Sequence, residues 1–458
     1  MEVIIQKTLL QDLKKCIAAQ NRLVLDKAAY FVSLINSLPT LCRGDEIDFM
    51  HVNLDSKRLK KIDWKASDYL KFLAKNGVIE KTRNHSSIHG KCAAYRIPEK
   101  YYFDEVVTFQ IWNTFLLRKF DQKGRELSKQ SKLEDCRMHR PHLVKWFDEN
   151  LTINMRDAHD EVCRHLKDGK HEKYIHGMQL ISEWANKSWT YSIKPETDNR
   201  LHSTLTRTNK SLRKHLTYNG KTLVGLDLKT SQPYFLSTIL MGLCLQDMEY
   251  LKRIGAVKMM GKGLIQELYN YMDIDEARCF VDIVINEDLY HALAKIIPID
   301  YDSETGKPFR NVRNNNIHGE FRVKRIYKSK RDCMKESVLT IFNCKKGYHS
   351  AEVKAFANAF PSIHKTIQHI KGHCDFNRLL NPVEAFCLLD CVAQKIAAKH
   401  PNMPLWSIHD SLVTTEDWAS ILHQDFEEYL FDLTNLKPTI KIEWWGEKWS
   451  IKESFQQQ

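Results

Sequence analysis

The sequence lacks the features that mark disulfide-bonded, zinc-binding and membrane-spanning proteins. Its 12 cysteines are scattered over 458 residues without a Cys-x-x-Cys pair, so neither a structural zinc nor a disulfide framework is expected. No uninterrupted apolar run reaches the roughly 20 residues that a membrane-spanning helix needs, and the first residues do not form a signal peptide. We therefore expect a cytoplasmic protein with reduced thiols and no membrane partner.

The composition is typical of a folded protein that binds a polyanion. Hydrophobic residues make up 43% of the chain, and 458 residues are too many for one ordinary core, so two or three domains are expected. The 69 Lys and Arg exceed the 57 Asp and Glu by 12, which gives the formal net charge of +12. Nucleic acid is the first candidate partner for a chain with this excess.

Residues 1–104 form a predicted N-terminal domain that resembles a winged helix. The first 40 residues have helical spacing, and a capped amphipathic helix begins at Ser67 and stops at Asn76-Gly77. A β-prone segment, a polar loop (83–91) and a second strand (92–97) follow. This order suggests a wing that contacts nucleic-acid phosphates, although many such modules only pack against protein. The wing residues would be Lys81, Arg83, His85, His89 and Lys91.

Residues 105–199 carry mixed charge and helical periodicity but no catalytic signature. They are expected to form a helical connector or a thumb-like region before the third segment, residues 200–458.

Two apolar runs in that third segment each end in an acid. Residues 222–227 form a predicted strand that ends at Asp227, because Pro233 cannot continue a central strand and favours a helix start. Residues 405–415 read as a hairpin with His409, Asp410 and Ser411 at its turn. Two such carboxylates could hold two Mg²⁺ ions roughly 3.5–4 Å apart and so promote phosphoryl transfer.

A strongly basic run lies between these acids in the sequence. After an Asn-rich stretch (311–318) expected to be a loop, the cations from Arg322 to Arg331 are expected to lead, as helix, into residues 334–343. Arg331 and Lys335 are one turn apart and share a helix face. They would grip a triphosphate, Arg331 with its planar fork and Lys335 as a point charge.

These three elements, in this order, resemble motifs A, B and C of family A DNA polymerases and phage-type single-subunit RNA polymerases. The resemblance covers about residues 200–445: Asp227 with Ser231 and Ser237, then Arg331-x-x-x-Lys335, then the Ile-His-Asp-Ser run at 408–411. It implies an α+β fold, a polymerase-like right hand with an antiparallel palm sheet and helical fingers, preceded by the winged-helix-like domain and the helical connector.

The resemblance also implies roles for single residues. Asp227 and Asp410, helped by the carbonyl of Leu228, would bind two Mg²⁺ ions, for which Mn²⁺ would be able to substitute. Lys335 and Arg331 would contact the nucleotide phosphates, and Lys335 would also be catalytic. The other substrate-contacting positions are His409 near the primer end, Arg200 and His202 against the template-primer, and Gln232 and Asn343 in motifs A and B.

Two departures from the family pattern keep alternatives open. A Tyr-Gly pair that family members carry after the motif B lysine is replaced by Asn343 and Cys344, and the position that selects the sugar falls on Gln232. The choice between deoxynucleoside and ribonucleoside triphosphates is therefore undecided. A serine-hydrolase triad at residues 409–411 is excluded, because adjacent strand residues point to opposite faces.

The leading hypothesis is a template-directed nucleic-acid polymerase of a plasmid, phage or mobile element. Its partners would be a nucleic-acid template, with or without a primer, and nucleoside triphosphates. The alternative is a DNA-binding replication initiator or regulator whose polymerase-like core is inactive.

Overall fold

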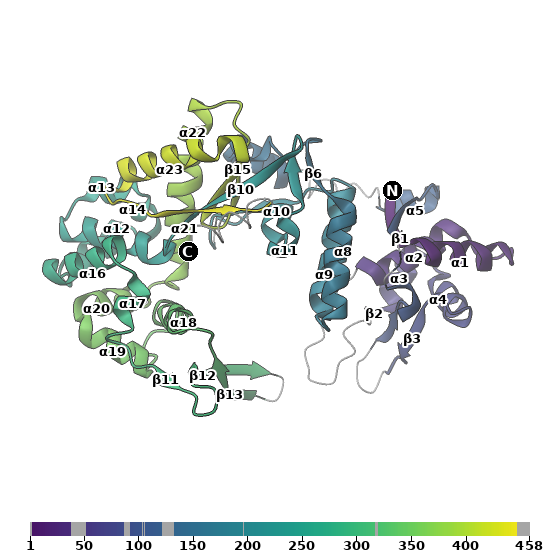
Figure 1. Cartoon of the computed structure of the whole chain (residues 1–458), viewed down its shortest axis with the longest axis horizontal. Coiled ribbons are helices and arrows are strands. Elements are labelled where there is room, and N and C mark those ends of the chain that lie inside the picture. Colours follow the sequence, from purple (N-terminus) through teal and green to yellow (C-terminus); the bar gives the residue numbers. More distant parts are fainter. Residues whose placement is uncertain are drawn as a thin grey trace.

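The computed structural model describes residues 2–37, 52–86, 92–102, 104, 106–120, 132–195, 197–316 and 319–446. It is a mixed α+β structure in which the ribbon forms an arch (Figure 1). One limb holds the N-terminal elements and the pair α8 (Met155–Lys167) and α9 (His171–Ala185), and the other holds helices of the C-terminal half. A six-stranded sheet lies at the top between them.

The chain begins with a strand, where residues 1–40 were expected to be helical. β1 (Glu2–Gln6) pairs antiparallel with β5 (Val106–Gln110), and α1 (Lys7–Ala18) and α2 (Leu25–Ser37) follow β1. Val3 and Ile5 are buried, as expected of alternate residues on one face of a strand. The prediction missed β1 because its partner lies about a hundred residues further along the chain.

The predicted helix, strand, loop and strand of the N-terminal region are present. α3 (Ser56–Ile62) and α4 (Ala66–Lys75) precede β3 (Glu80–Arg83) and β4 (Ala93–Arg96), and β2 (Val52–Leu54) completes a sheet in the order β2-β4-β3. α4 buries Tyr69, Leu70 and Leu73 on one face. The loop between β3 and β4 includes His89 and Lys91, which lie outside the described residues.

The segment expected to be a helical connector also contributes strands. Besides α5 (Thr114–Phe120), a helix at 132–139, α7 (Pro141–Val144), α8 and α9, it contains β6 (Leu151–Ile153) and β7 (Tyr191–Ile193). β6 pairs with β9 (Leu216–Tyr218), and β7 pairs with β8 (Leu201–Ser203). The connector is thereby hydrogen-bonded into the sheet that carries the predicted acids.

That sheet is antiparallel throughout, as expected. Its order is β14 (Trp406–Ile408), β15 (Ser411–Thr415), β10 (Lys221–Leu228), β9 and β6, and β16 (Ile440–Trp444) lies on the other side of β10 from β15. The predicted strand ending near Asp227 and the predicted hairpin at 405–415 are both confirmed.

Alternation along β10 divides the apolar side chains between two cores. Val224, Leu226 and Leu228 are buried with residues of α12 (Ser231–Cys244) and α23 (Ala419–Thr434). Leu223 belongs to a second core that contains residues of the N-terminal region and of α8 and α9. Asp227 shares its side of the strand with Leu223, because residues two and four apart on a strand point the same way.

The helices of the C-terminal half surround the larger of the two cores. They are α13 (Met248–Arg253), α14 (Ala256–Met260), α15 (Lys262–Tyr269), α16 (Ile274–Asn286), α17 (Leu289–Leu293), α18 (Lys330–Asn343), α19 (Ala351–Ala359), α20 (Pro361–Ile370), α21 (Asn377–Ala385) and α22 (Ala393–Lys399). Short helices α10 (Thr204–Arg207) and α11 (Lys210–Arg213) precede β9. None of the described helices is long and apolar enough to span a membrane.

Two local predictions in this half were wrong. The Asn-rich stretch and the basic run after it form a hairpin, β12 (Pro308–Asn316) and β13 (Gly319–Ile326), which β11 (Asp300–Tyr301) extends. The helix starts only at α18, where the Ser329 hydroxyl accepts a hydrogen bond from the Asp332 N–H at 3.1 Å.

Two helical glycines allow the packing of α12 against α13 to be tested with the same substitution. A Cβ at Gly242 of α12 would lie 2.5 Å from Leu251 Cδ2, whereas one at Gly263 of α15 would meet nothing within 4 Å. Gly242→Ala should therefore lower the free energy of unfolding by about 1–3 kcal/mol. Gly263→Ala should raise it by up to about 1 kcal/mol, because alanine favours helix. Urea denaturation of both variants measures the two changes in the free energy of unfolding. Two changes of the same sign would contradict this packing.

Candidate active site

The structure brings the two predicted acids to adjoining positions. Asp227 lies near the end of β10, paired with Ser411 of β15, and Asp410 is the residue just before Ser411. The Leu228 N–H points to the Asp410 carbonyl oxygen at 3.5 Å. Two carboxylates separated by 183 positions in the sequence are thus adjacent at one end of the sheet.

The hairpin that carries Asp410 has a tight turn. Ile408 pairs with Ser411, so that His409 and Asp410 alone make the loop. His409 has a positive φ of 54°, and two-residue hairpin loops require this region at one or both loop positions. The Ser411 hydroxyl donates to the Ile408 carbonyl at 3.0 Å. The left-handed backbone conformation of His409 therefore allows the tight turn that holds Asp410 at the tip, close to the end of β10.

The surroundings of Asp227 disfavour its charge. Burial, and then the negative charges of Asp410 and Glu443, raise its pKa to about 6, while Lys335 and Lys441 act in the opposite direction. Lys441 is the residue paired with Asp227 on β16. Lys335 and Lys441 thus offset the burial and the two neighbouring acids only in part, and a bound cation would lower the pKa of Asp227 further.

Helix α18 presents its cations toward these acids. Lys335 is exposed and lowers the pKa of Asp227, and it makes no side-chain hydrogen bond or ion pair within the described part of the chain. Arg331, one turn earlier, is engaged: its Nε lies 3.3 Å from an Asp288 carboxylate oxygen and its guanidinium 4.8 Å from the centre of the Tyr290 ring. The prediction that the two residues occupy one helix is confirmed.

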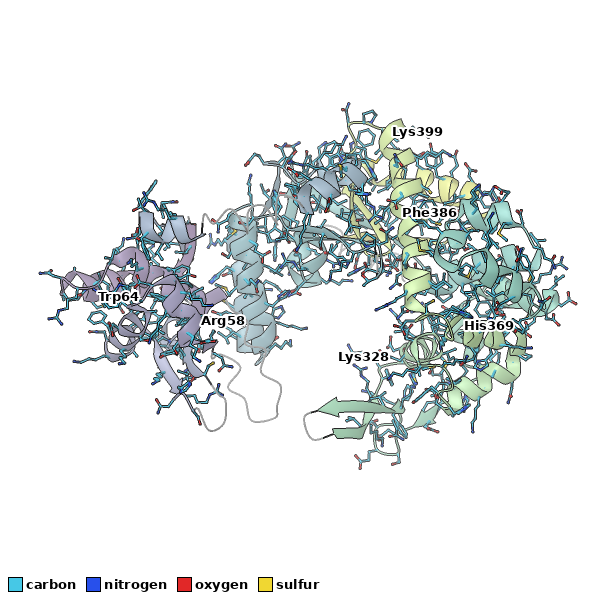
Figure 2. The ribbon with its side chains drawn as sticks, turned by 180° about the vertical axis from the view of Figure 1, so that it is seen from behind. Arg58, Trp64, Lys328, His369, Phe386 and Lys399 are labelled. Carbon is cyan, nitrogen blue, oxygen red and sulfur yellow. The ribbon has the colours of Figure 1, made fainter. Side chains whose placement is uncertain are left out.

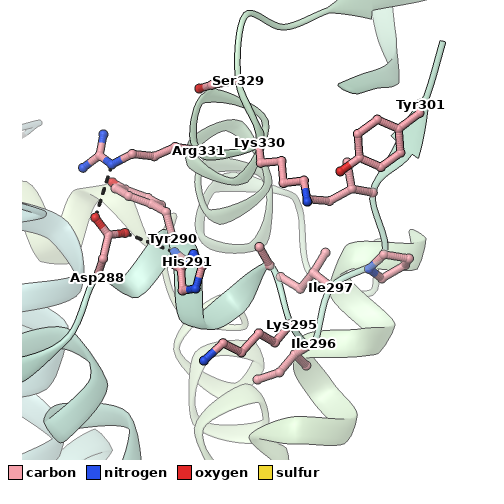
Figure 3. A pocket seen from close by; sticks show the side chains of 13 residues that line it. Asp288, Tyr290, His291, Lys295, Ile296, Ile297, Tyr301, Ser329, Lys330 and Arg331 are labelled. Carbon is pink, nitrogen blue, oxygen red and sulfur yellow. Dashed lines mark hydrogen bonds and ion pairs between the residues drawn. The ribbon is translucent and has the colours of Figure 1, made fainter. Parts of the chain in front are cut away.

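A cavity of about 800 Å³ opens beside the first turn of α18 (Figure 3). Asp288, Tyr290, Tyr301, Lys330 and Arg331 are among its lining residues. Lys330 lies 5.8 Å from the centre of the exposed Tyr301 ring. Tyr290, whose ring lies next to the Arg331 guanidinium, thus belongs to the same cavity wall as the ion pair of Arg331 with Asp288.

A buried acid that the sequence reasoning missed completes this neighbourhood. Glu384 of α21 is 1% exposed and forms an ion pair with Arg200, whose Nε donates to it at 2.9 Å, and it also accepts from the Ser231 hydroxyl. Burial raises its pKa to about 7, against the opposing charge of Arg200, and Asp410 adds to the rise. A single acid in the apolar run from Val383 to Leu389 was the available signal.

Three further residues that were predicted to contact the substrate are His202, Gln232 and His409. His202 bonds to Asp198 at 2.9 Å, and the Gln232 amide donates to both Asn377 and Asn381 of α21 at 3.3 Å. His409 is exposed, and its pKa is lowered by desolvation and then by Arg200.

The end of α18 differs from a base-stacking platform. Asn343 is exposed at the last position of the helix, and its neighbour Phe342 is buried with its ring centre 5.6 Å from that of Phe376. Phe342 is therefore a core residue and does not replace the missing tyrosine.

The predicted phosphate contacts of the N-terminal region lie on the other limb of the arch, in β3 (Figure 1). Lys81 is exposed, and Arg83 donates to the Asn53 amide oxygen and, at 3.4 Å, to the Cys92 carbonyl. Lys91 lies outside the described residues. These cations are not part of the site around Asp227.

The donors around Asp227 suit magnesium. Mg²⁺ prefers oxygen ligands and takes few carboxylates, which matches two aspartates with the Leu228 carbonyl nearby. Among the described residues, a separate group of three close metal-ligating side chains is formed by Glu267, His369 and His373. Its two imidazoles suit zinc better than magnesium, so it is no alternative for the predicted Mg²⁺ site.

Comparisons with known proteins add little to this picture. No protein-family model and no curated protein matches the sequence. Among solved structures, the POL domain of Pol1 from M. smegmatis, in complex with a DNA primer-template and a dNTP, matches with a TM-score of 0.32 and 11% identity. The match covers 63% of this chain and 55% of that one, so this chain spans about half of the polymerase domain. A TM-score this low does not establish a common fold.

The raised pKa of Asp227 gives a stability prediction with a defined sign. Between about pH 4 and pH 6 the unfolded chain loses this proton while the folded chain keeps it, so the native state loses stability as the pH rises. Asp227→Asn removes the penalty and should stabilise the metal-free protein at pH 7.5 by about 1 kcal/mol, after allowance for solvent screening.

The measurement is thermal unfolding with a chelator present, across pH 4–7.5. The gain from Asp227→Asn should be largest above pH 6 and vanish near pH 4. A variant less stable than the parent at pH 7.5 would contradict this electrostatic description.

Proposed function

We propose that this protein is a template-directed nucleotidyltransferase that adds nucleotides to a 3′-hydroxyl with two divalent cations. The observation that carries the proposal is the adjacency of Asp227 and Asp410 at one sheet end, facing an unpaired lysine on α18. Phosphoryl transfer needs little more than positioned charge on both sides of the reacting phosphorus.

Asp227 and Asp410 would hold the metal ions, with the Leu228 carbonyl as a further oxygen ligand. When bound, Mg²⁺ or Mn²⁺ lowers the pKa of the attacking hydroxyl and neutralises charge on the leaving phosphate. Lys335 would approach the triphosphate from the side opposite the metal ions. Its positive charge lowers the pKa of Asp227, and no described residue pairs with it.

Arg331 would join Lys335 on the phosphates after leaving Asp288. The pair is half-exposed, with side-chain exposures of 52% and 37%, and such ion pairs contribute at most about 1 kcal/mol. A triphosphate offers Arg331 more negative charge than one carboxylate does, so the exchange is favourable. The cavity beside α18 would provide room for the nucleotide next to Lys330 and Arg331.

Residues around the site would position the nucleic acid. Arg200 and His202 would face the template-primer, His409 the primer end, and Gln232 and Asn343 the nucleotide. Residues 1–104 would form a nucleic-acid-binding domain through Lys81, Arg83 and Lys91, residues 105–199 the connecting region, and residues 200–458 the catalytic core. The net charge of +12 supports a polyanionic partner for the whole chain.

The decisive experiment is nucleotide incorporation on primed and unprimed templates, with dNTPs and NTPs in parallel and Mg²⁺ present. Asp227→Ala and Asp410→Ala should each reduce kcat about a thousandfold, which corresponds to the several kcal/mol that metal ions contribute to the barrier. Arg331→Ala should mainly raise KM for the triphosphate.

The matched control is Asp275→Ala, which removes a 96% exposed aspartate of α16 and should leave incorporation unchanged. Incorporation that survives either active-site substitution would refute the proposal. Salt-dependent duplex binding by the parent protein, with no incorporation of any nucleotide, would instead favour an initiator or regulator with an inactive core.

A further inference from the structure

Two adjoining cavities lie beside the strand pair β7–β8 and the helix at 132–139. They measure about 880 and 730 Å³, and they share Leu133, Arg137, Trp189 and Tyr191 in their walls. Because they have these walls in common, we treat them as one groove, called here the 132–207 groove. No residue of this groove belongs to the metal site described above.

The groove has an aromatic floor that is held in place from behind. The rings of Trp189 and Tyr191 stand edge-on to Phe147, with centres 5.9 and 5.0 Å from it, and Trp189 also contacts Trp184 at 5.1 Å. Both rings are partly exposed and line both cavities. Fixed rings of this kind can stack on bases at little entropic cost.

The rim of the groove is basic. Lys132, Arg137 and Lys194 are exposed and form no side-chain hydrogen bond or ion pair among the described residues, so their charges are available to a ligand. Arg207 and Lys187 also line it but are paired with Glu183 and Glu149. Asp148, the acid in the groove wall, accepts hydrogen bonds from the Tyr218 hydroxyl at 2.9 Å and from the Asn150 N–H.

One end of the groove is near the catalytic hairpin. His202 lines the first cavity and belongs to β8, which contacts β14, and β14 ends at Ile408 directly before the turn. His409 is the neighbour of Asp410 in the two-residue turn. A strand that occupies the groove can therefore continue toward the metal-binding acids.

We infer that the 132–207 groove binds a single strand of nucleic acid that continues from the catalytic site. Trp189 and Tyr191 stack on its bases, and Lys132, Arg137 and Lys194 contact its phosphates. A duplex fits less well, because its base faces are covered, and an acidic peptide would make no use of the aromatic floor. This inference rests on the proposed function for the direction of the strand, but binding itself can be measured without catalysis.

The test is fluorescence anisotropy with a labelled oligothymidylate of about 12 nucleotides, a length within the range of single-strand sites. A chelator is present, and the protein carries Asp227→Ala and Asp410→Ala so that no turnover occurs. Adding Lys132→Ala, Arg137→Ala and Lys194→Ala should weaken binding at least about tenfold and lower the slope of log Kd against log salt by about 2.

The control variant in the same background carries Lys258→Ala, Lys262→Ala and Lys354→Ala, three exposed lysines of α14, α15 and α19. It loses the same total charge far from the groove and should bind as the background protein does. Equal affinity and equal salt slope for the groove and control variants would overturn the inference. Competition by polyglutamate as effective as that by unlabelled oligothymidylate would overturn it too.

Failure of this inference is distinguishable from failure of the proposed function. Groove-dependent binding by a protein that incorporates no nucleotide would refute the polymerase proposal and leave the groove in place. Nucleotide incorporation by a protein whose strand binding is unchanged by the groove substitutions would refute the groove inference and leave the polymerase proposal in place.

Discussion

The repulsion between Asp227 and Asp410 is the constraint on which the other features of the site depend. The pairing of β10 with β15 and the two-residue turn at His409 hold both acids at one end of the sheet, although burial and like charge raise the pKa of Asp227 to about 6. A pKa raised by burial together with specific charge partners marks a candidate functional site. The exposed Lys335 of α18 acts on the same acid, whereas Arg331 is held by Asp288 and the Tyr290 ring.

The connector links the sheet of the two acids to the strands beside the groove. β6 joins it to the six-stranded sheet through β9, whereas β7 pairs with β8 in a separate two-stranded sheet. Figure 2 shows Lys328, at the base of the basic hairpin, on the side of its limb that faces the N-terminal limb, with Arg58 and Trp64 on the latter. The charge excess is thus spread over both limbs.

Local patterns in the sequence were sufficient to predict the elements that carry the acids. The apolar run at 222–227 and the apolar and β-prone runs at 405–415 predicted the strands, and Pro233 marked the helix that follows. β12 and β13 were missed because their polar Asn and Arg residues resemble a loop or a charged helix. The pairing of the two strands with each other, which defines the hairpin, is not visible in the local sequence. Glu384 was missed because its ion pair with Arg200 joins residues 184 positions apart.

The most direct test of the two-acid site is calorimetric titration of the protein with Mn²⁺ at pH 7.5 and pH 5.5. Binding should be clear at pH 7.5, weaken at pH 5.5 as protons compete for Asp227, and disappear in both Asp227→Asn and Asp410→Asn. Mn²⁺ binding that neither substitution changes would contradict the assignment of these two acids as the metal ligands.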